Sequence, residues 1–433
     1  MIFSVLVSFV TCILMLVGVL KFPKISLGII HTDSYWVITL LGALVLILTG
    51  QGDISFVWQS LTADTAINPI KILTLFVSMT VLSIFLDEMG LFRFLASWVL
   101  SHAKTSQKKL FVYLYLIVSV LTVFTSNDVI ILSFTPFICY FAKNAKINPI
   151  PYLAAEFVAA NTWSMALIIG NPTNIYLASA YGIGFAEYVG KMLLPTLVAG
   201  SVALFALYLS FGKMLNEEMQ CESERNGFED KVSLAIGIAH LATCTVMLAI
   251  SSYVGIEMYK VALCCVISLF VCVLVASAIR RKSPKALGVS LLRAPWQLIP
   301  FVLSMFVMIL VLDGKGATAY IADALGESFT VFGYGFASFF SANVINNIPM
   351  SVLFCSVIEN LTPTLQQSAV YATVIGSNIG AFLSPIGALA GIMWSSILSM
   401  HGAGFYLRDF LRMGVKIAIP TMCASLLALS LVM

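Results

Sequence analysis

The chain has 433 residues, of which 60% are hydrophobic and 10% are charged, and its formal net charge is +3. Soluble domains carry about 25% charged residues, so 23 basic and 20 acidic side chains are too few to cover a water-soluble globule of this length. A mean hydropathy of +1.01 indicates that most of the surface faces lipid. The small net charge also excludes a nucleic-acid footprint, so no nucleic-acid partner is expected.

The first apolar segment, Ile2–Leu20, has no Lys or Arg before it and no small-residue cleavage pattern after it. It is expected to be a retained span rather than a signal peptide. The nine cysteines include no CxxC pair and the four histidines form no HExxH motif, so neither a disulfide framework nor a metal site is expected. Walker, GxSxG and glycine-rich nucleotide motifs are absent, so we expect no enzymatic activity and no cofactor.

Helices of about 20 apolar residues are needed to cross a bilayer core of about 30 Å. The sequence predicts five such spans on each side of a polar linker at 212–231, which makes the fold class an all-α polytopic membrane protein. The predicted spans are Ile2–Leu20, Tyr35–Thr49, Ile70–Leu86, Tyr152–Ala180, Tyr188–Phe211, Val232–Ser252, Met258–Ile279, Gln297–Leu312, Ala369–Ser399 and Leu411–Val432.

Each half also contains an apolar region that polar residues interrupt, at about 110–142 and about 329–359. The arms on either side of these polar tips have about 9 to 15 residues, which is short for a span. We therefore predict two re-entrant hairpins, whose tips must be buried in protein or face a water-filled cavity. Two full spans are the alternative, because either arrangement gives an even number of crossings.

The two halves, 1–211 and 232–433, resemble each other in sequence. The stretch Ser78–Gly90 recurs at Ser304–Gly316, and the polar tips and two Pro-containing interruptions then follow in the same order. An odd number of spans in each half requires the second copy to be inverted. We therefore predict two inverted repeats of five transmembrane helices, each with a re-entrant hairpin and one broken helix.

The distribution of positive charge predicts the orientation. When ten spans are threaded through the membrane, all of the 23 Lys and Arg residues lie on one face except Lys71, Lys191, Lys260 and Lys315. The positive-inside rule makes the crowded face cytoplasmic. The 212–231 linker is then predicted to be cytoplasmic, with both termini outside the cell membrane.

The apolar segments at about 152–180 and about 369–399 are predicted to be broken helices. Pro172 removes an amide donor, and Asn171 can cap a new helix that starts at the proline. Ser384 and Pro385 repeat this arrangement in the second half. Two half-helix N-termini would then point at the membrane midplane, where they could offer amide donors to a ligand. The alternative is a proline kink that neighbouring helices satisfy.

Polar side chains at the hairpin tips are the second group of candidates. They could bind a substrate or cation, or they could only cap the second arm of each hairpin. Asp128 adds a carboxylate to the first tip that its repeat partner, the neutral Asn347, lacks; it could carry a coupling proton or Na⁺, or act as a cap. Glu156 is a weaker candidate because it lies near the end of a span. The other tip residues are Ser126, Asn127 and Asn346.

These residues resemble motifs of the ion transporter superfamily, and more closely its arsenite permease (ArsB) and NhaD-like branch than its dicarboxylate/sodium symporter branch. The resemblance spans nearly the whole chain and implies an elevator-like carrier that holds its substrate between the hairpin tips and the broken helices. It is carried by SerAsnAspVal (126–129), GlyAsnProThrAsn (170–174), AsnAsnIlePro (346–349) and IleGlySerAsnIleGly…SerProIleGlyAlaLeu (375–389).

The resemblance also implies which residues bind. Asp128, with Asn127 and Asn347, is implied for a coupling ion. In the dicarboxylate branch a SerAsnThr tip binds Na⁺, and because Asp128 replaces the threonine here, proton coupling is at least as well supported. The implied substrate-binding residues are Ser126, Asn127, Asn171, Thr173, Asn174, Asn346, Asn347, Ser377, Asn378 and Ser384.

The predicted function is secondary active transport of an inorganic anion or metalloid, such as arsenite or antimonite, out of the cell and driven by a proton or sodium gradient. The alternatives are a cation-coupled citrate or dicarboxylate symporter and a Na⁺/H⁺ antiporter. An ion channel would use the same hairpins as a filter. The expected partners are the small substrate and the lipid bilayer. A homodimer and a separate ATPase subunit of an arsenite pump are also compatible with the resemblance.

Cysteines introduced at Ser106 and Ser283 test the predicted orientation. Both positions lie on the face rich in Lys and Arg. In a variant without reactive native cysteines, both should be protected from membrane-impermeant thiol reagents in intact cells, while Lys315→Cys on the opposite face should be labelled. Labelling of Ser106→Cys and Ser283→Cys from outside would contradict the orientation.

Overall fold

The computed structural model describes residues 1–22, 24–27, 30–65, 68–217, 219, 228, 230–385, 387–403 and 407–433. These residues are mainly helical, with one antiparallel pair of strands, β1 (Lys24–Leu27) and β2 (Ile30–Asp33). Half of the predicted linker at 212–231 lies outside the described residues, as does Ile386 of the last sequence motif.

The helices of the first half follow the predicted spans and hairpin arms, and two short helices, α3 and α5, were not predicted. The elements are α1 (Ile2–Lys21), α2 (Ser34–Leu48), α3 (Ile54–Thr62), α4 (Pro69–Glu88), α5 (Leu91–Ala103), α6 (Gln107–Phe124), α7 (Asn127–Asn144), α8 (Ile150–Trp163), the 3-10 turns η1 (Ser164–Ala166) and η2 (Ile168–Gly170), α9 (Pro172–Ala180) and α10 (Phe185–Phe211).

The second half has the same order of long and short helices, and α13, like α3, is nine residues long. The elements are the 3-10 turn η3 (Met214–Asn216), α11 (Lys231–Val254), α12 (Met258–Ile279), α13 (Lys285–Arg293), α14 (Leu298–Asp313), α15 (Ala317–Leu325), α16 (Thr330–Ile345), α17 (Asn347–Glu359), α18 (Pro363–Gly380), α19 (Leu389–Met400) and α20 (Leu407–Ser430).

Within the described residues, eight stretches are long and apolar enough to cross a membrane. Three of the ten predicted spans are not among them, and one helix outside the predicted spans is. The segments around 152–180 and 369–399 are divided into shorter helices, and α2 has only 15 residues, or about 22 Å at 1.5 Å per residue. Conversely, α6 qualifies although a short arm was predicted, because Ser106 caps it at Gln107 and adds a polar first turn. The eight stretches are α1, α4, α6, α10, α11, α12, α13 together with α14, and α20.

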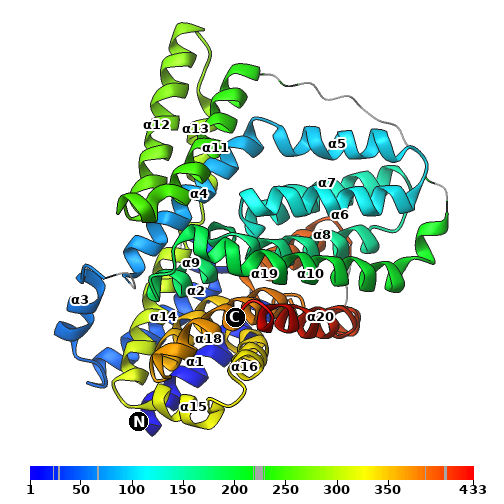
Figure 1. Ribbon diagram of the computed structural model, residues 1–433. Helices are drawn as coiled ribbons and strands as arrows, with labels where there is room; N and C mark the ends of the chain where they lie inside the picture. The colour runs from blue at the N-terminus through cyan, green and yellow to red at the C-terminus, as the bar shows by residue number, and fades with distance from the viewer. Residues whose placement is uncertain are drawn as a thin grey trace.

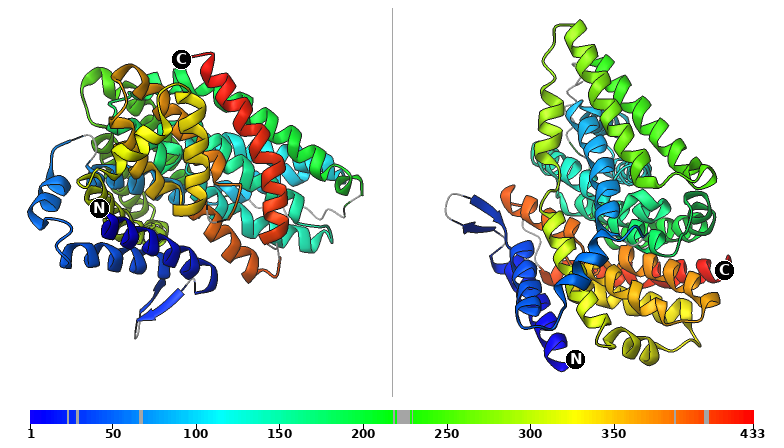
Figure 2. Two further views of the ribbon diagram at one scale, coloured as in Figure 1. Left: turned by 90° about the horizontal axis from the view of Figure 1, so that it is seen from below. Right: turned by 90° about the vertical axis from the view of Figure 1, so that its left-hand side faces the viewer.

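Packing crosses between the two halves. Helix α4 of the first half packs on α12 of the second, while α14 of the second half packs on α2 of the first. Helices α10 and α20 lie side by side (Figure 2). Figure 1 shows α6, α7, α8 and α10 stacked as one body, with α11 and α12 projecting from it. The halves therefore form one interlocked molecule.

Helices α8 and α18 lie at the centre of this molecule. All residues from Pro151 to Thr162 and from Ala369 to Gly380 are buried. The short helix α9 packs on α17, and α19 packs on α7. Each broken helix thus places its second part against the hairpin of the other half, which brings the predicted tips and breaks into one region.

Three helices, α5, α7 and α12, end at a basic residue with a positive φ, a conformation that favours glycine. Lys146 follows α7 at φ 53°. Its amide donates to the Lys143 carbonyl, and the Ile147 amide donates to the Ala142 carbonyl at 3.0 Å. This bonding pattern ends many helices, usually with glycine at the left-handed position. Arg281 at φ 52° ends α12 in the same way.

Lys146→Gly is expected to be more stable than Lys146→Ala. Both substitutions remove the same charge, but only glycine adopts the left-handed conformation without steric cost. The difference should be on the order of 1 kcal/mol in the free energy of unfolding. Thermal unfolding of both detergent-solubilised variants measures it. Equal stability would show that the turn is not strained.

Candidate functional site

The break in the first half occupies eight residues between α8 and α9. Helix α8 ends at Trp163, the two 3-10 turns follow, and α9 begins at Pro172. Asn171 is extended (φ −151°, ψ 141°), and its Oδ1 accepts the Thr173 amide at 3.2 Å. Gly170 allows the tight return, because a Cβ there would lie 2.2 Å from the Ser164 carbonyl oxygen. The α9 N-terminus is thus capped by the chain's own Asn171.

The break in the second half differs from the sequence prediction. Ser384 does not cap a helix that starts at Pro385; α18 ends at Gly380 and α19 begins only at Leu389. The chain instead turns, with the Gly387 amide donating to the Ser384 carbonyl at 3.1 Å. This turn packs so closely on α19 that a Cβ at Gly391 would lie 2.3 Å from the Pro385 carbonyl oxygen. Glycine at position 391 therefore permits the close approach of α19 to this turn.

Asn378, near the end of α18, joins the two halves at the first break. Its Oδ1 accepts a hydrogen bond from Asn171 Nδ2 at 3.0 Å, and its Nδ2 donates to Asn174 Oδ1 at 2.8 Å. The Ser164 hydroxyl also lies 2.8 Å from Asn378 Oδ1. All four side chains are essentially inaccessible to solvent. One amide of the second half therefore satisfies three polar side chains of the broken helix in the first half.

Hydroxyl groups extend this network. Ser377 Oγ donates to Thr173 Oγ1 at 2.8 Å. The neighbouring residues Ser377 and Asn378 of α18 therefore both bind the start of α9. Asn174 Nδ2 in turn donates to the carbonyl oxygens of Ser164 and Leu167. The carbonyls released by the break are thus satisfied by side chains, as burial requires. We call these residues the amide network: Ser164, Asn171, Thr173, Asn174, Ser377 and Asn378.

Asn161 occupies the place in α8 that Asn378 occupies in α18. Each lies two residues before its helix ends, and each donates from Nδ2 to the carbonyl four residues earlier at 2.8 Å. Asn161 Oδ1 accepts from Asn127 Nδ2 of the first hairpin tip at 3.2 Å. Because the Ser164 hydroxyl lies 2.8 Å from the Asn161 carbonyl, the first tip is linked to the amide network.

The first tip carries the candidate carboxylate. Ser126 caps α7, and the Asp128 amide donates to Ser126 Oγ and Asn127 Oδ1. The Asp128 side chain is 7% exposed, and no described residue donates a hydrogen bond to its carboxylate. A buried carboxylate without donors is costly, so Asp128 is suited to exchange a proton or hold a cation.

The second tip has a strained backbone. Asn346 has φ 72° and ψ 153°, a region occupied almost only by glycine that costs other residues roughly 1–3 kcal/mol. Its Oδ1 accepts the Ile348 amide at 3.3 Å, and the Asn347 amide donates to the Gly387 carbonyl at 3.1 Å. Asn347 Oδ1 is buried and accepts no hydrogen bond from the described residues. Such a strained tip with an unused acceptor is a strong ligand-site candidate.

Other predicted residues lie apart from the amide network. Ser384 donates instead to Asn343 Oδ1 at the second tip, and Asn343 Nδ2 donates to the Gly380 carbonyl at 3.0 Å. Glu156 of α8 is fully buried, and Thr135 of α7 donates to its Oε1 at 2.8 Å. Sequence analysis did not propose Asn161, Ser164 or Asn343 as site residues. Asn161 and Ser164 could have been found, because each is an uncharged polar side chain inside a predicted apolar span.

Two voids share Tyr176 as a lining residue. A cavity of about 220 Å³ is lined by Tyr176, Asp313 and Glu359. Tyr176 also lines a void of about 10 Å³ beside Pro172 and Ile348. Tyr176 therefore stands between an acidic outer cavity and the junction of the first break with the second tip. Carboxylates at the cavity favour cations over anions electrostatically.

Comparison with known proteins agrees with this architecture. The sequence profile of the CitMHS citrate transporters matches residues 4–374. The chain belongs to this family. The "Arsenical pump membrane protein" of Escherichia coli (strain K12) is 28% identical over 411 residues, which cover 90% of this chain and 92% of that protein. The protein of the same name from Yersinia enterocolitica is 27% identical over 415 residues, which cover 92% and 93%.

Among solved structures, the Alcanivorax borkumensis YdaH transporter has the same fold. It aligns with a TM-score of 0.55 at 13% identity, over 99% of this chain and 98% of that one. The predicted all-α polytopic fold and the resemblance to the arsenite permease branch are therefore confirmed, and this member of the citrate transporter family is a multi-pass membrane protein.

Asn378→Ala tests the amide network. The substitution leaves buried groups of Asn171, Asn174 and Ser164 without their partner, which should lower the free energy of unfolding by roughly 1–3 kcal/mol. Asn360→Ala is the matched control, because Asn360 is exposed and bonds only within its own helix end. Thermal unfolding in detergent compares the two variants. An Asn378→Ala protein as stable as Asn360→Ala would refute the network.

Proposed function

We propose that this protein is a secondary active transporter that exports a trivalent metalloid hydroxide, arsenite or antimonite in type, in exchange for protons or Na⁺. Membership of the citrate transporter family and the arsenical pump relatives support transport. The proposed substrate position is the region where the two tips and the amide network meet.

The observation that carries the proposal is the lack of basic side chains among the described residues of that region. Apart from the Asp128 carboxylate, the network and tips offer amides and hydroxyls, and no described Lys or Arg forms a hydrogen bond or ion pair with any of them. At neutral pH, arsenite is mainly an uncharged trihydroxide that both donates and accepts hydrogen bonds. Amide groups, which also do both, suit such a molecule better than they suit a multiply charged carboxylate.

A citrate or dicarboxylate symporter is the second candidate, favoured by the family's description. Such a substrate needs compensating positive charge, which here would have to come from bound cations. The carboxylates of Asp313 and Glu359 at the outer cavity would repel it. A Na⁺/H⁺ antiporter remains the third candidate, and Asp128 would be its ion site.

The inverted repeats, re-entrant hairpins and elevator motion belong to this proposal. The matching order of helices, the shared position of Asn161 and Asn378, and the contacts of α9 with α17 and of α19 with α7 support them. The cytoplasmic placement of the 212–231 linker, the external termini, a homodimer and an ATPase partner are also proposals.

Purified protein in proteoliposomes tests the substrate. Arsenite, antimonite, citrate, succinate and sulfate would be supplied in turn with an imposed pH or Na⁺ gradient, together with a Na⁺/H⁺ exchange assay. Saturable, gradient-dependent flux of arsenite or antimonite is expected. Flux of citrate or succinate alone would establish the second candidate, and Na⁺/H⁺ exchange alone the third.

Asp128→Asn tests the coupling role. Asparagine keeps the shape and the capping ability of aspartate but cannot release a proton. Gradient-driven accumulation of substrate is therefore expected to be lost, while exchange of labelled for unlabelled substrate continues. Asp323→Asn removes an exposed carboxylate from α15 and serves as control. Wild-type accumulation by Asp128→Asn would move the coupling site elsewhere, with Glu156 the next candidate.

A further inference from the structure

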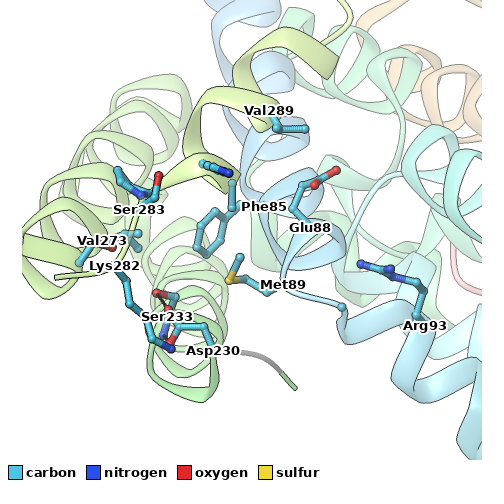
Figure 3. Close-up of a pocket in the computed structure, with 15 residues that line it drawn as sticks. Phe85, Glu88, Met89, Arg93, Asp230, Ser233, Val273, Lys282, Ser283 and Val289 are labelled. Carbon is cyan, nitrogen blue, oxygen red and sulfur yellow. Dashed lines mark hydrogen bonds between the residues drawn. The ribbon is translucent and has the colours of Figure 1, made fainter. Parts of the chain in front are cut away.

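A charged cavity lies far from the amide network, on the face predicted to be cytoplasmic. It has a volume of about 540 Å³ and is formed by the end of α4, the start of α11, the end of α12, and α13 (Figure 3). Its charged lining residues are Glu88, Arg93, Asp230, Lys282 and Lys285. The proposed transport mechanism uses none of them.

The two acidic residues of this cavity already have partners. Asp230 forms an ion pair with Arg280, and its Oδ2 accepts a hydrogen bond from Ser233 at 2.8 Å. The Arg280 guanidinium holds the pKa of the Asp230 carboxyl well below its usual range, so this carboxylate stays ionised and bound. Glu88 forms an ion pair with Arg293 of α13. Arg293 also pairs with Asp87, so each acid of the lining has a cationic partner, although Glu88 shares its own.

The three basic residues of the lining have no such partners among the described residues. Arg93, Lys282 and Lys285 are exposed, and none forms an ion pair with a described residue. Arg280 and Arg293 offset all but one of the carboxylates of Asp87, Glu88 and Asp230, so with these three cations the described residues in and around the cavity carry a net positive charge. In the view of Figure 3, Lys282 and Arg93 lie on opposite sides of Phe85.

The backbone turn that positions Lys282 requires an unfavourable conformation at the preceding residue. Arg281 has φ 52° where glycine is usual, and this turn lets the Lys282 amide donate to the Ser277 carbonyl at 2.9 Å. Lys282 is thereby folded back over the last turn of α12. The buried side chains of Phe85 and Val273 give the cavity an apolar floor beneath the cationic rim.

The cavity also lies at the ends of two predicted membrane spans. Most of the surface of α11 and α12 is left uncovered by the rest of the described chain. Headgroups of the adjacent leaflet are expected at the ends of such spans. Basic pockets between transmembrane helices on the cytoplasmic side bind anionic headgroups.

We propose that this cavity binds a phosphate group, contributed by an anionic phospholipid of the adjacent leaflet or by a free phosphate compound. Arg93, Lys282 and Lys285 bind the phosphate oxygens, and the apolar floor accepts the carbon chain attached to them. A bound phosphate would join α5, through Arg93, to the end of α12 and to α13, and so tie together helices of both halves beside the contacts of α4 with α12 and α13.

The test uses the full-length protein in neutral detergent. Binding of phosphatidylglycerol and cardiolipin, with phosphatidylcholine as reference, would be measured by native mass spectrometry, and binding of inorganic phosphate by thermal shift. Arg93→Gln/Lys282→Gln/Lys285→Gln should weaken binding roughly 100-fold, given the contribution of each basic residue near a membrane surface. Lys108→Gln/Lys143→Gln/Lys213→Gln removes equal charge from exposed sites on the same predicted face and should leave binding unchanged.

Selective loss of anionic lipid binding in the first triple variant supports the proposal with lipid as the source. Selective loss of inorganic phosphate binding, without lipid binding, supports it with a soluble source. Equal weakening in both triple variants, or no binding of either ligand to the wild-type protein, would overturn it. The three side chains are exposed, so the melting temperature without ligand should stay unchanged and distinguish lost binding from misfolding.

Discussion

The structure depends on one constraint, which is that no backbone polar group can be left unpaired in an apolar interior. Two helices at the centre of the molecule are interrupted, and every interruption releases amides and carbonyls that water would satisfy in a soluble protein. Here side-chain amides take the place of water. Asn174 binds the carbonyls of Ser164 and Leu167, Asn171 caps α9, and Asn343 binds the carbonyl of Gly380.

This constraint also explains why the halves are interlocked. Asn378 belongs to α18, yet it satisfies side chains of the break between α8 and α9, so neither half is chemically complete without the other. Whole helices also pack across the two halves. Helix α4 of the first half contacts α12 of the second, and α14 of the second half contacts α2 of the first. All members of the amide network lie in α18, in α9 or in the break between α8 and α9, so the network belongs wholly to the centre of the molecule.

The sequence was informative where a local rule decides the structure. Apolar length predicted most of the spans, and the start of α9 follows from Asn171 and Pro172 alone. The start of α19 did not follow from Ser384 and Pro385, because the close packing of Gly391 on the Pro385 carbonyl is a tertiary contact. Asn378 lies 207 residues from Asn171, so the sequence could nominate both residues, and the family resemblance did so, but it could not pair them.

The two tips are chemically different, and the difference bears on how a neutral substrate could be coupled to an ion. The first tip has relaxed backbone and a carboxylate without donors, which suits a proton or cation. The second has strained backbone at Asn346 and an unused oxygen on Asn347, which suits a hydrogen-bond donor. Asn127 links the first tip to the amide network, while the Asn347 amide links the second tip to the other break. Each tip is thus bonded to the break of its own half, the first through Asn161 and Ser164 and the second through the Gly387 carbonyl. A hydroxyl-bearing, uncharged substrate can use the second tip without competing for the charge at the first, whereas a carboxylate would be repelled by Asp128 unless a cation neutralised it.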